Sequence, residues 1–144
     1  MKIKTAIALA ISLFSVGLAT SVSAHDLRFK TLMPANGVGA TDVWEVGCQN
    51  SQRLVAQVKD HDLDTNKVVL ILYKDGKAVT STDLVGEDSD YSPLVSLSAG
   101  SGTYSMMVGH NKPGFKLYSI TYHCENASGS HTPTTVPSTP VQDQ

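Results

Sequence analysis

The chain has 144 residues, and its 41% of hydrophobic residues are enough for the modest core of one domain. Its 11 basic and 13 acidic residues give a net charge of −2. This small negative charge argues against nucleic acid or an anionic membrane as the partner, because both are bound by clustered positive charge.

The first 24 residues have the pattern of a secretory signal peptide. Lys2 and Lys4 precede an apolar run from Ala6 to Leu18, and small residues lead to Ala24. This order of basic, apolar and small residues favours cleavage after Ala24. The run is too short for a membrane span. We therefore predict a signal peptide over residues 1–24 and a periplasmic or secreted protein without a membrane span. Loss of the two lysines leaves 9 basic and 13 acidic residues.

The two cysteines, Cys48 and Cys124, predict a disulfide, because an exported chain is oxidised. Such a bond closes a loop of about 77 residues, for which the chain-entropy model gives roughly 4–4.5 kcal/mol. The alternative is a pair of free or metal-binding thiols. Zinc-type spacing of cysteine and histidine is absent from the sequence, which favours the disulfide.

Residues 25–125 read as a succession of short strands separated by turns. Alternating or continuous apolar patterns cover Leu27–Thr31, Asp42–Cys48, Arg53–Lys59, Val68–Tyr73, Ala78–Ser81, Pro93–Ser98, Thr103–His110 and Phe115–Cys124. About seven or eight such strands predict an all-β fold, an antiparallel β-sandwich. The β-branched run Val68–Tyr73 is typical of a central strand covered on both faces.

Two hairpins are expected within this pattern. Asp75-Gly76 supplies the positive φ angles of a tight turn after Val68–Tyr73. The segment Asn111–Gly114 predicts a second hairpin, between Thr103–His110 and Phe115–Cys124. Alternation leaves the register of this second hairpin open, since a four-residue turn pairs Val108 with Leu117, on the face opposite to Cys124.

The last residues, 126–144, differ in composition from the rest. They are rich in Ser, Thr and Pro and contain almost no large apolar residue. Such a segment buries too little surface to offset its ordering entropy, so we predict a disordered tail. Asn126-Ala127-Ser128 fits a glycosylation sequon, which a Ser-rich tail also contains by chance.

Several segments resemble the bacterial pre-peptidase C-terminal domain family. They are 42–46 (DVWEV), 70–76 (LILYKDG), 99–108 (AGSGTYSMMV) and 118–122 (YSITY). The resemblance implies a jelly-roll-like sandwich that is non-catalytic and acts as a binding or solubilising module of secreted peptidases, sometimes with calcium. In this chain only the predicted signal peptide precedes the domain, which departs from the family pattern.

His25 is the first candidate for chemistry. Cleavage after Ala24 would place an imidazole and an α-amino group on one residue, and copper favours such nitrogen ligands. His110, beside the Asn111–Gly114 turn, is the best second ligand. The remaining pool consists of His61, His123, Met33, Met106 and Met107, with His131 in the tail as the weakest member. The alternative is that histidine is first by chance.

The second candidate is an acidic loop with the spacing Asp60-x-Asp62-x-Asp64. It is similar to the first half of a calcium loop, but Thr65 and Ile71 replace the glycine and glutamate that an EF-hand needs. A simpler calcium site remains, with further donors from Glu87, Asp88 or Asp90. The alternative is a solvated acidic loop that discourages edge-to-edge aggregation.

The sequence contains no local pattern of catalytic residues: it has no nucleophile elbow or HExxH pair, and its cysteines are expected to be oxidised. We therefore expect an exported, non-catalytic binding or accessory module, stabilised by calcium if the acidic loop binds it. Its partner is an unidentified protein or small ligand. The alternative function is that of a periplasmic copper-binding protein that uses His25.

Overall fold

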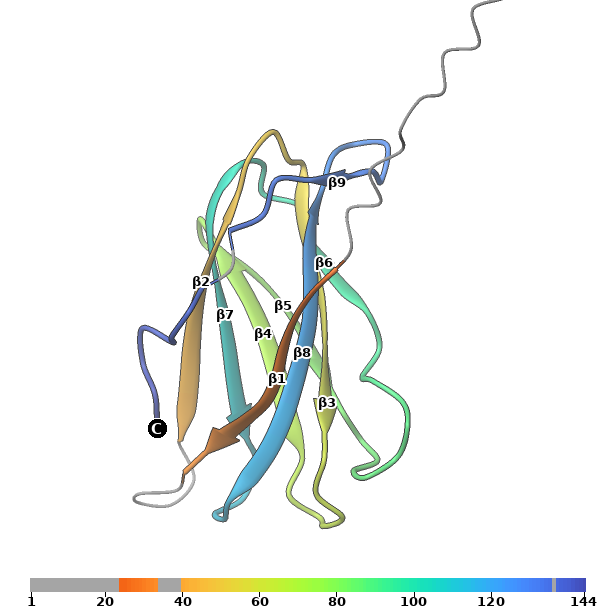
Figure 1. Cartoon of the computed structure of the whole chain (residues 1–144), viewed down its shortest axis with the longest axis vertical. Coiled ribbons are helices and arrows are strands. Elements are labelled where there is room, and N and C mark those ends of the chain that lie inside the picture. The colour runs from red at the N-terminus through yellow and green to blue at the C-terminus, as the bar shows by residue number, and fades with distance from the viewer. Residues whose placement is uncertain (1–23, 34–39, 136) are drawn as a thin grey trace, which may run out of the picture.

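The computed structural model describes residues 24–33, 40–135 and 137–144, and within them it contains strands and no helix (Figure 1). The strands are β1 (His25–Leu32), β2 (Thr41–Cys48), β3 (Arg53–Asp60), β4 (Val68–Lys74), β5 (Lys77–Thr82), β6 (Val95–Leu97), β7 (Gly102–His110), β8 (Lys116–Glu125) and β9 (His131–Thr132). The described part of the chain thus offers no helix with the length and hydropathy to cross a bilayer. The residues of the predicted signal peptide before Ala24 lie outside the described residues.

The strands form two antiparallel sheets that face each other, so the predicted β-sandwich is confirmed. The first sheet has the order β1-β8-β3-β6, with β9 added to β8, and the second has the order β2-β7-β4-β5. Four hydrogen-bonded pairs are nested within one another along the chain: β1 with β8, β2 with β7, β3 with β6, and β4 with β5. One long hairpin rolled up in this way is a jelly roll.

This topology shows that the predicted hairpin between the last two long strands is wrong. β7 and β8 belong to different sheets, and the segment between them crosses from one sheet to the other. Tyr104 and Met106 of β7 and Tyr118 and Ile120 of β8 are all fully buried in the one core that lies between the two sheets. The alternation of apolar residues identifies the buried face of each strand. The same pattern arises whether two strands pair within one sheet or face each other from two sheets, so it does not predict the partner of a strand.

The predicted disulfide is confirmed, and it joins the two sheets. Cys48 at the end of β2 is bonded to Cys124 near the end of β8, with a Cα–Cα distance of 5.6 Å. Trp44 and Val46 precede Cys48 on the same buried face of β2. The side chain of Trp44 also crosses the core, because its Nε1 donates to the hydroxyl of Tyr118 at 3.1 Å. The disulfide therefore closes one end of a core that both sheets share.

Two local expectations have opposite outcomes. The β4–β5 hairpin is confirmed, with positive φ angles of 50° at Asp75 and 74° at Gly76. The expectation that the Val68–Tyr73 run is covered on both faces is wrong. Leu70 and Leu72 are fully buried, whereas Tyr73 is 44% exposed, because only the inner face of this sheet is packed against the other sheet.

A β-bulge in β1 also departs from simple alternation. The register with β8 shifts between Leu27 and Lys30, and Phe29 has a φ of 50°. Its side chain is 63% exposed, while Leu32 is fully buried. The predicted inward alternation of Leu27, Phe29 and Thr31 therefore fails after Leu27, since a bulge inserts one residue and reverses the faces that follow.

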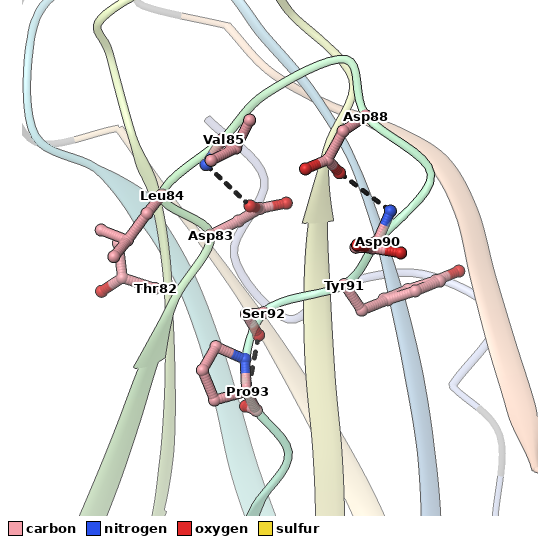
Figure 2. A pocket seen from close by; sticks show the side chains of 9 residues that line it. All are labelled: Thr82, Asp83, Leu84, Val85, Asp88, Asp90, Tyr91, Ser92 and Pro93. Carbon is pink, nitrogen blue, oxygen red and sulfur yellow. Dashed lines mark hydrogen bonds between the residues drawn. The ribbon is translucent and has the colours of Figure 1, made fainter.

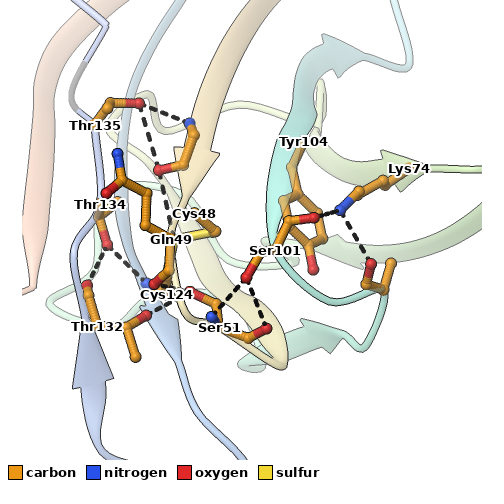
Figure 3. Close-up of a disulfide and its surroundings, with 12 residues drawn as sticks. Cys48, Gln49, Ser51, Lys74, Ser101, Tyr104, Cys124, Thr132, Thr134 and Thr135 are labelled. Atoms are coloured by element: carbon orange, nitrogen blue, oxygen red, sulfur yellow. Dashed lines mark hydrogen bonds between the residues drawn. A yellow bond between two sulfur atoms is a disulfide. The ribbon is translucent and has the colours of Figure 1, made fainter.

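The prediction of a disordered tail is wrong for the described residues of 126–144. β9 pairs with the end of β8, and the segment then crosses to β2 next to the disulfide (Figure 3). Gly47 donates to Thr135 Oγ1 at 2.7 Å, and the Thr135 amide donates to the Gly47 carbonyl at 2.9 Å. Further on, Val43 and Gln142 form a bridge. The tail is ordered by hydrogen bonds to the open edge of β2. These bonds offset its ordering entropy, although the segment has few apolar residues to bury.

Candidate metal centre

The structure does not bring His25 and His110 together. His25 lies opposite Tyr122, near the end of β8, whereas His110 ends β7 and pairs with Val68 at the start of β4. The charges that act on His110 are those of Lys116, the first residue of β8, and of Asp64 in the β3–β4 loop. Six residues of strand separate Lys116 from Tyr122, which is roughly 20 Å. The predicted copper pair is therefore wrong, because its two histidines lie at opposite ends of the sandwich.

His110 has a structural environment instead. It is 8% exposed, and its Nδ1 lies 2.9 Å from Nδ2 of Asn66. The amide of Asn66 donates this hydrogen bond, so Nδ1 of His110 is the acceptor. Burial, together with the nearby Lys116 ammonium, lowers the pKa of His110. A neutral, buried imidazole at this place fastens the end of β7 to the β3–β4 loop.

The three aspartates of the predicted calcium loop surround a lysine. Nζ of Lys116 lies 2.8 Å from Asp60 Oδ2, 2.9 Å from Asp64 Oδ1 and 4.0 Å from Asp62 Oδ2. The side chains of Lys116 and Asp60 are both 0% exposed. The cation held by these carboxylates is thus an ammonium of the chain itself. A calcium ion in the same position would have to displace it and leave a buried positive charge without a partner.

Hydrogen bonds within the acidic loop fix this arrangement. The Asp62 amide donates to Asp60 Oδ1, the Asn66 amide to Asp64 Oδ1, and the Leu117 amide to Asp62 Oδ2. Burial disfavours the charged form of Lys116, but the hydrogen bonds from its ammonium to Asp60 and Asp64 prevail and raise its pKa. Lys116 therefore stays charged and replaces a metal as the centre of the loop.

A second acidic segment, between β5 and β6, lines a cavity of about 170 Å³ (Figure 2). Asp83 Oδ2 accepts a hydrogen bond from the Asp60 amide, and its Oδ1 accepts one from the Val85 amide. Asp88 Oδ1 accepts from the Asp90 amide at 2.8 Å. Asp83 thus ties its loop to the end of β3, and Asp88 serves the backbone of its own loop. The predicted contribution of Asp88 and Asp90 to a calcium site thus has no support from their contacts.

A different group of side chains, at the disulfide end, has the geometry of a metal centre. His123, Glu125 and His131 each present one ligand atom, and these three atoms lie within 4.8 Å of one another. Nε2 of His123 is 2.8 Å from Oε1 of Glu125, and the rings of His123 and His131 have centroids 4.0 Å apart. All three residues are half-buried. We refer to this group as the three-residue centre.

Strand geometry explains why these residues meet. His123 and Glu125 are two positions apart on β8, so their side chains leave the same face of the sheet, opposite to the buried Cys124. His131 pairs with Glu125 across the β8–β9 ladder and therefore shares that face. The connecting turn is held by Asn126, whose Oδ1 accepts from the amides of Ser128 and Ser130.

Arg53 on β3 orients the carboxylate of this centre. Its Nε and Nη2 both lie 2.6 Å from Oε2 of Glu125, which leaves Oε1 directed at His123. Burial alone favours the neutral acid, but the hydrogen bonds from His123 and Arg53 prevail and lower the pKa of Glu125. The carboxylate is therefore ionised and positioned before any ligand arrives, as a metal ligand must be.

Two imidazoles and one carboxylate suit a first-row transition metal such as Cu²⁺ or Zn²⁺. Ligand atoms at about 2.0–2.1 Å from a tetrahedral ion are about 3.3 Å apart. The 2.8 Å between His123 Nε2 and Glu125 Oε1 is about 0.5 Å shorter than this, and no two ligand atoms of the group are more than 4.8 Å apart. Adjustments of at most about 1.5 Å would therefore place the three atoms around one ion, and half-buried side chains achieve them by rotation. Three protein ligands leave a fourth position open.

In the sequence, His123 and His131 are only weaker members of the pool of copper ligands, and Glu125 is not among the candidates. His123-x-Glu125 is visible as a pair on one strand face. The predicted disordered tail separates His131 from that pair, although Asn126 and Gly129, with its φ of 82°, are turn signals directly after a strand. A hairpin across residues 126–130 is the signal that would join the three.

Comparisons with known proteins add no family to this description. No family model matches the chain, and no curated protein sequence matches it. The resemblance to pre-peptidase C-terminal domains therefore stays a prediction.

Proposed function

We propose that the protein is an exported, non-catalytic module that binds a divalent transition metal, with Cu²⁺ the favoured ion, at His123, Glu125 and His131. The observation that carries the proposal is the convergence of three ligand atoms within 4.8 Å on a pre-oriented face of the sandwich. Cu²⁺ is favoured because it binds most nitrogen and oxygen sites more strongly than the other divalent first-row ions do.

Export supports this assignment through the disulfide. Cys124 of the Cys48–Cys124 bond lies one residue from His123 and one from Glu125 on β8, so oxidation helps to hold the end of β8 in place. Disulfides persist in oxidising compartments, where a signal peptide over residues 1–24 would deliver the chain.

The test is a Cu²⁺ titration of protein in which a short, N-terminally acetylated Gly-Ser extension precedes His25, so that no free α-amino group can bind the metal. We expect one tight equivalent, with electron paramagnetic resonance showing coupling to two imidazole nitrogens. His123→Asn and His131→Asn should each weaken binding by about 100-fold or more, because removal of even an outer partner of a metal ligand costs 10–100-fold.

The matched control is His61→Asn, at the opposite end of the molecule. His61 is also half-buried on the first sheet, where its Nε2 contacts Ser119 Oγ at 2.8 Å. Binding by this variant should equal that of the parent protein. The proposal fails if the extended protein takes up no tight equivalent, or if His61→Asn weakens binding as much as His131→Asn does. Either result would favour a module that binds another partner.

A further inference from the structure

The start of β1 lies at the same end of the first sheet as the three-residue centre. β1 pairs with β8 so that His25 is opposite Tyr122, and β9 pairs with the following part of β8 so that His131 is opposite Glu125. β3 occupies the other edge of β8 along this whole stretch. β1 and β9 therefore follow each other along one edge of β8. Figure 1 shows β9 near the upper end of the sandwich and β1 running downward from below it.

His123 lies between these two register positions. One step along β8 from Tyr122 reaches His123, and one step back along β1 from His25 reaches Ala24, which is exposed. Neighbouring strands are about 4.8 Å apart, so an antiparallel continuation of β1 passes beside His123 at that distance. The peptide bond between Ala24 and His25 is thus next to a ligand of the centre. It is also the bond that the predicted signal cleavage breaks.

We propose that cleavage after Ala24 completes the metal centre, because the new α-amino group of His25 becomes its fourth ligand. This inference rests on the proposed function and supplies the open position of the three-residue centre. A nitrogen donor suits Cu²⁺ better than it suits the harder divalent ions. Tight binding of the metal is then confined to the processed protein, since an amide nitrogen in the uncleaved chain is not a comparable ligand.

The register also places the imidazole of His25 and its α-amino group differently relative to the centre. Residues directly opposite each other in an antiparallel pair share a face, so the ring of His25 is on the side of buried Tyr122. The two ring centroids are 5.7 Å apart. His123 and Glu125 project from the other face. The amine, which lies in the plane of the sheet, can reach the centre, whereas the imidazole remains with Tyr122.

The experiment compares protein that begins at His25 with protein that carries the Gly-Ser extension; all nine strands lie within 25–144 in both. We expect the free amine to strengthen Cu²⁺ binding by about 100-fold, as a further ligand in a preformed site. The paramagnetic resonance spectrum should change from two coupled nitrogens to three. His25→Ala, with its own free amine, should keep this gain to within about threefold, as expected for a residue whose side chain is not a ligand.

Separate outcomes overturn the two proposals. Equal affinity and equal spectra for the free and extended proteins would disprove the role of the amine and leave the three-residue centre intact. A gain that disappears in His25→Ala, yet survives in His131→Asn, would show that the terminal residue chelates copper alone. That result would also disprove the shared centre. We expect the free amine to strengthen binding over that of the extended protein. This gain should be kept in His25→Ala and lost in His131→Asn.

Discussion

The two ends of the sandwich use similar charged side chains in different ways. At the β3–β4 end, Lys116 is fully buried and lies 2.8 Å from Asp60 and 2.9 Å from Asp64. At the disulfide end, the side chains of His123 and Glu125 are 16% and 14% exposed. There, the nearest protein cation, Arg53, contacts Oε2 of Glu125, and Oε1 remains directed at His123.

A group of carboxylates therefore does not by itself indicate a metal site. A covalently attached ammonium can be buried permanently, because the strand that carries it supplies the geometry and the carboxylates balance its charge. A metal has to enter and leave, and it needs ligands that are deprotonated and accessible. Half-buried imidazoles next to an ionised glutamate satisfy that condition, and a fully buried ion pair does not.

Removal of the buried ammonium should have the largest effect. In Lys116→Met, the buried carboxyl of Asp60 loses the ammonium that balances it, so we expect the free energy of unfolding to fall by about 3–5 kcal/mol. Urea denaturation measures this loss. Lys112→Met is the matched control, since its Nζ contacts Thr65 at the same end but is exposed, and it should change stability by less than about 0.5 kcal/mol.

The same variant, together with a chelator, distinguishes Lys116 from calcium as the cation that the acidic loop holds. A calcium chelator should leave the unfolding midpoint of the parent protein unchanged, because Lys116 already occupies the position among Asp60, Asp62 and Asp64. A Lys116→Met protein within about 1 kcal/mol of the parent would contradict the assignment, since breaking a buried ion pair is expected to cost several times as much. A chelator-dependent midpoint in the parent would contradict it as well.

The disulfide end should respond to acid through Glu125. The pKa of Glu125 is lowered in the folded protein from its ordinary value of 4.5, because hydrogen bonds from His123 and Arg53 outweigh burial. The unfolded chain therefore takes up this proton first as the pH falls. Its contribution to stability, about 1 kcal/mol, is complete above 4.5 and is lost as the pH drops through the lower folded value.

Glu125→Gln should accordingly be less stable than the parent near neutral pH and equal to it in strong acid, with metal removed by a chelator. Urea denaturation at several pH values measures the difference. Glu45→Gln is the matched control, because Glu45 is an exposed glutamate on β2 and its replacement should change stability by less than about 0.5 kcal/mol. A constant deficit of Glu125→Gln at all pH values would show that packing, rather than charge, is the cause.

Much of the fold follows from the sequence, because it depends on local patterns. Alternation predicts the strands, Asp75-Gly76 predicts a hairpin, and the two cysteines predict the disulfide. Strand partners could not be predicted in the same way. β7 and β8 are consecutive and both amphipathic, but they face each other across the core rather than pair, and alternation is identical in the two cases.

The sites depend on contacts between distant parts of the chain, which explains why they were harder to predict. Asp64 and Lys116 are 52 positions apart, and nothing in the acidic loop itself shows which cation it holds. The three-residue centre forms because the β8–β9 turn brings His131 beside β8. The composition of residues 126–144 predicts disorder and therefore does not indicate this turn. Polar segments can be ordered by backbone hydrogen bonds to an open strand edge, and composition does not count these.

The smallest expected effect concerns that ordered tail, which anchors one side of the three-residue centre. A Cβ on Gly47 would lie 2.7 Å from Thr135 Oγ1, so Gly47→Ala should push the segment after β9 away from β2. We expect a loss of about 0.5 kcal/mol in global stability, typical of a surface site, with faster hydrogen exchange at Thr135 and Val141.

Gly109→Ala is the matched control for this change. The nearest atoms to its added Cβ would be 3.6 Å away, an ordinary contact, so exchange in the tail should not change. Cu²⁺ affinity should fall by about threefold in Gly47→Ala, because a loosened β9 holds His131 less firmly, as loss of an outer partner does on a small scale. Unchanged exchange at Thr135 together with unchanged affinity would mean that the tail does not support the centre. The disulfide end would then owe its geometry to β8 and β3 alone.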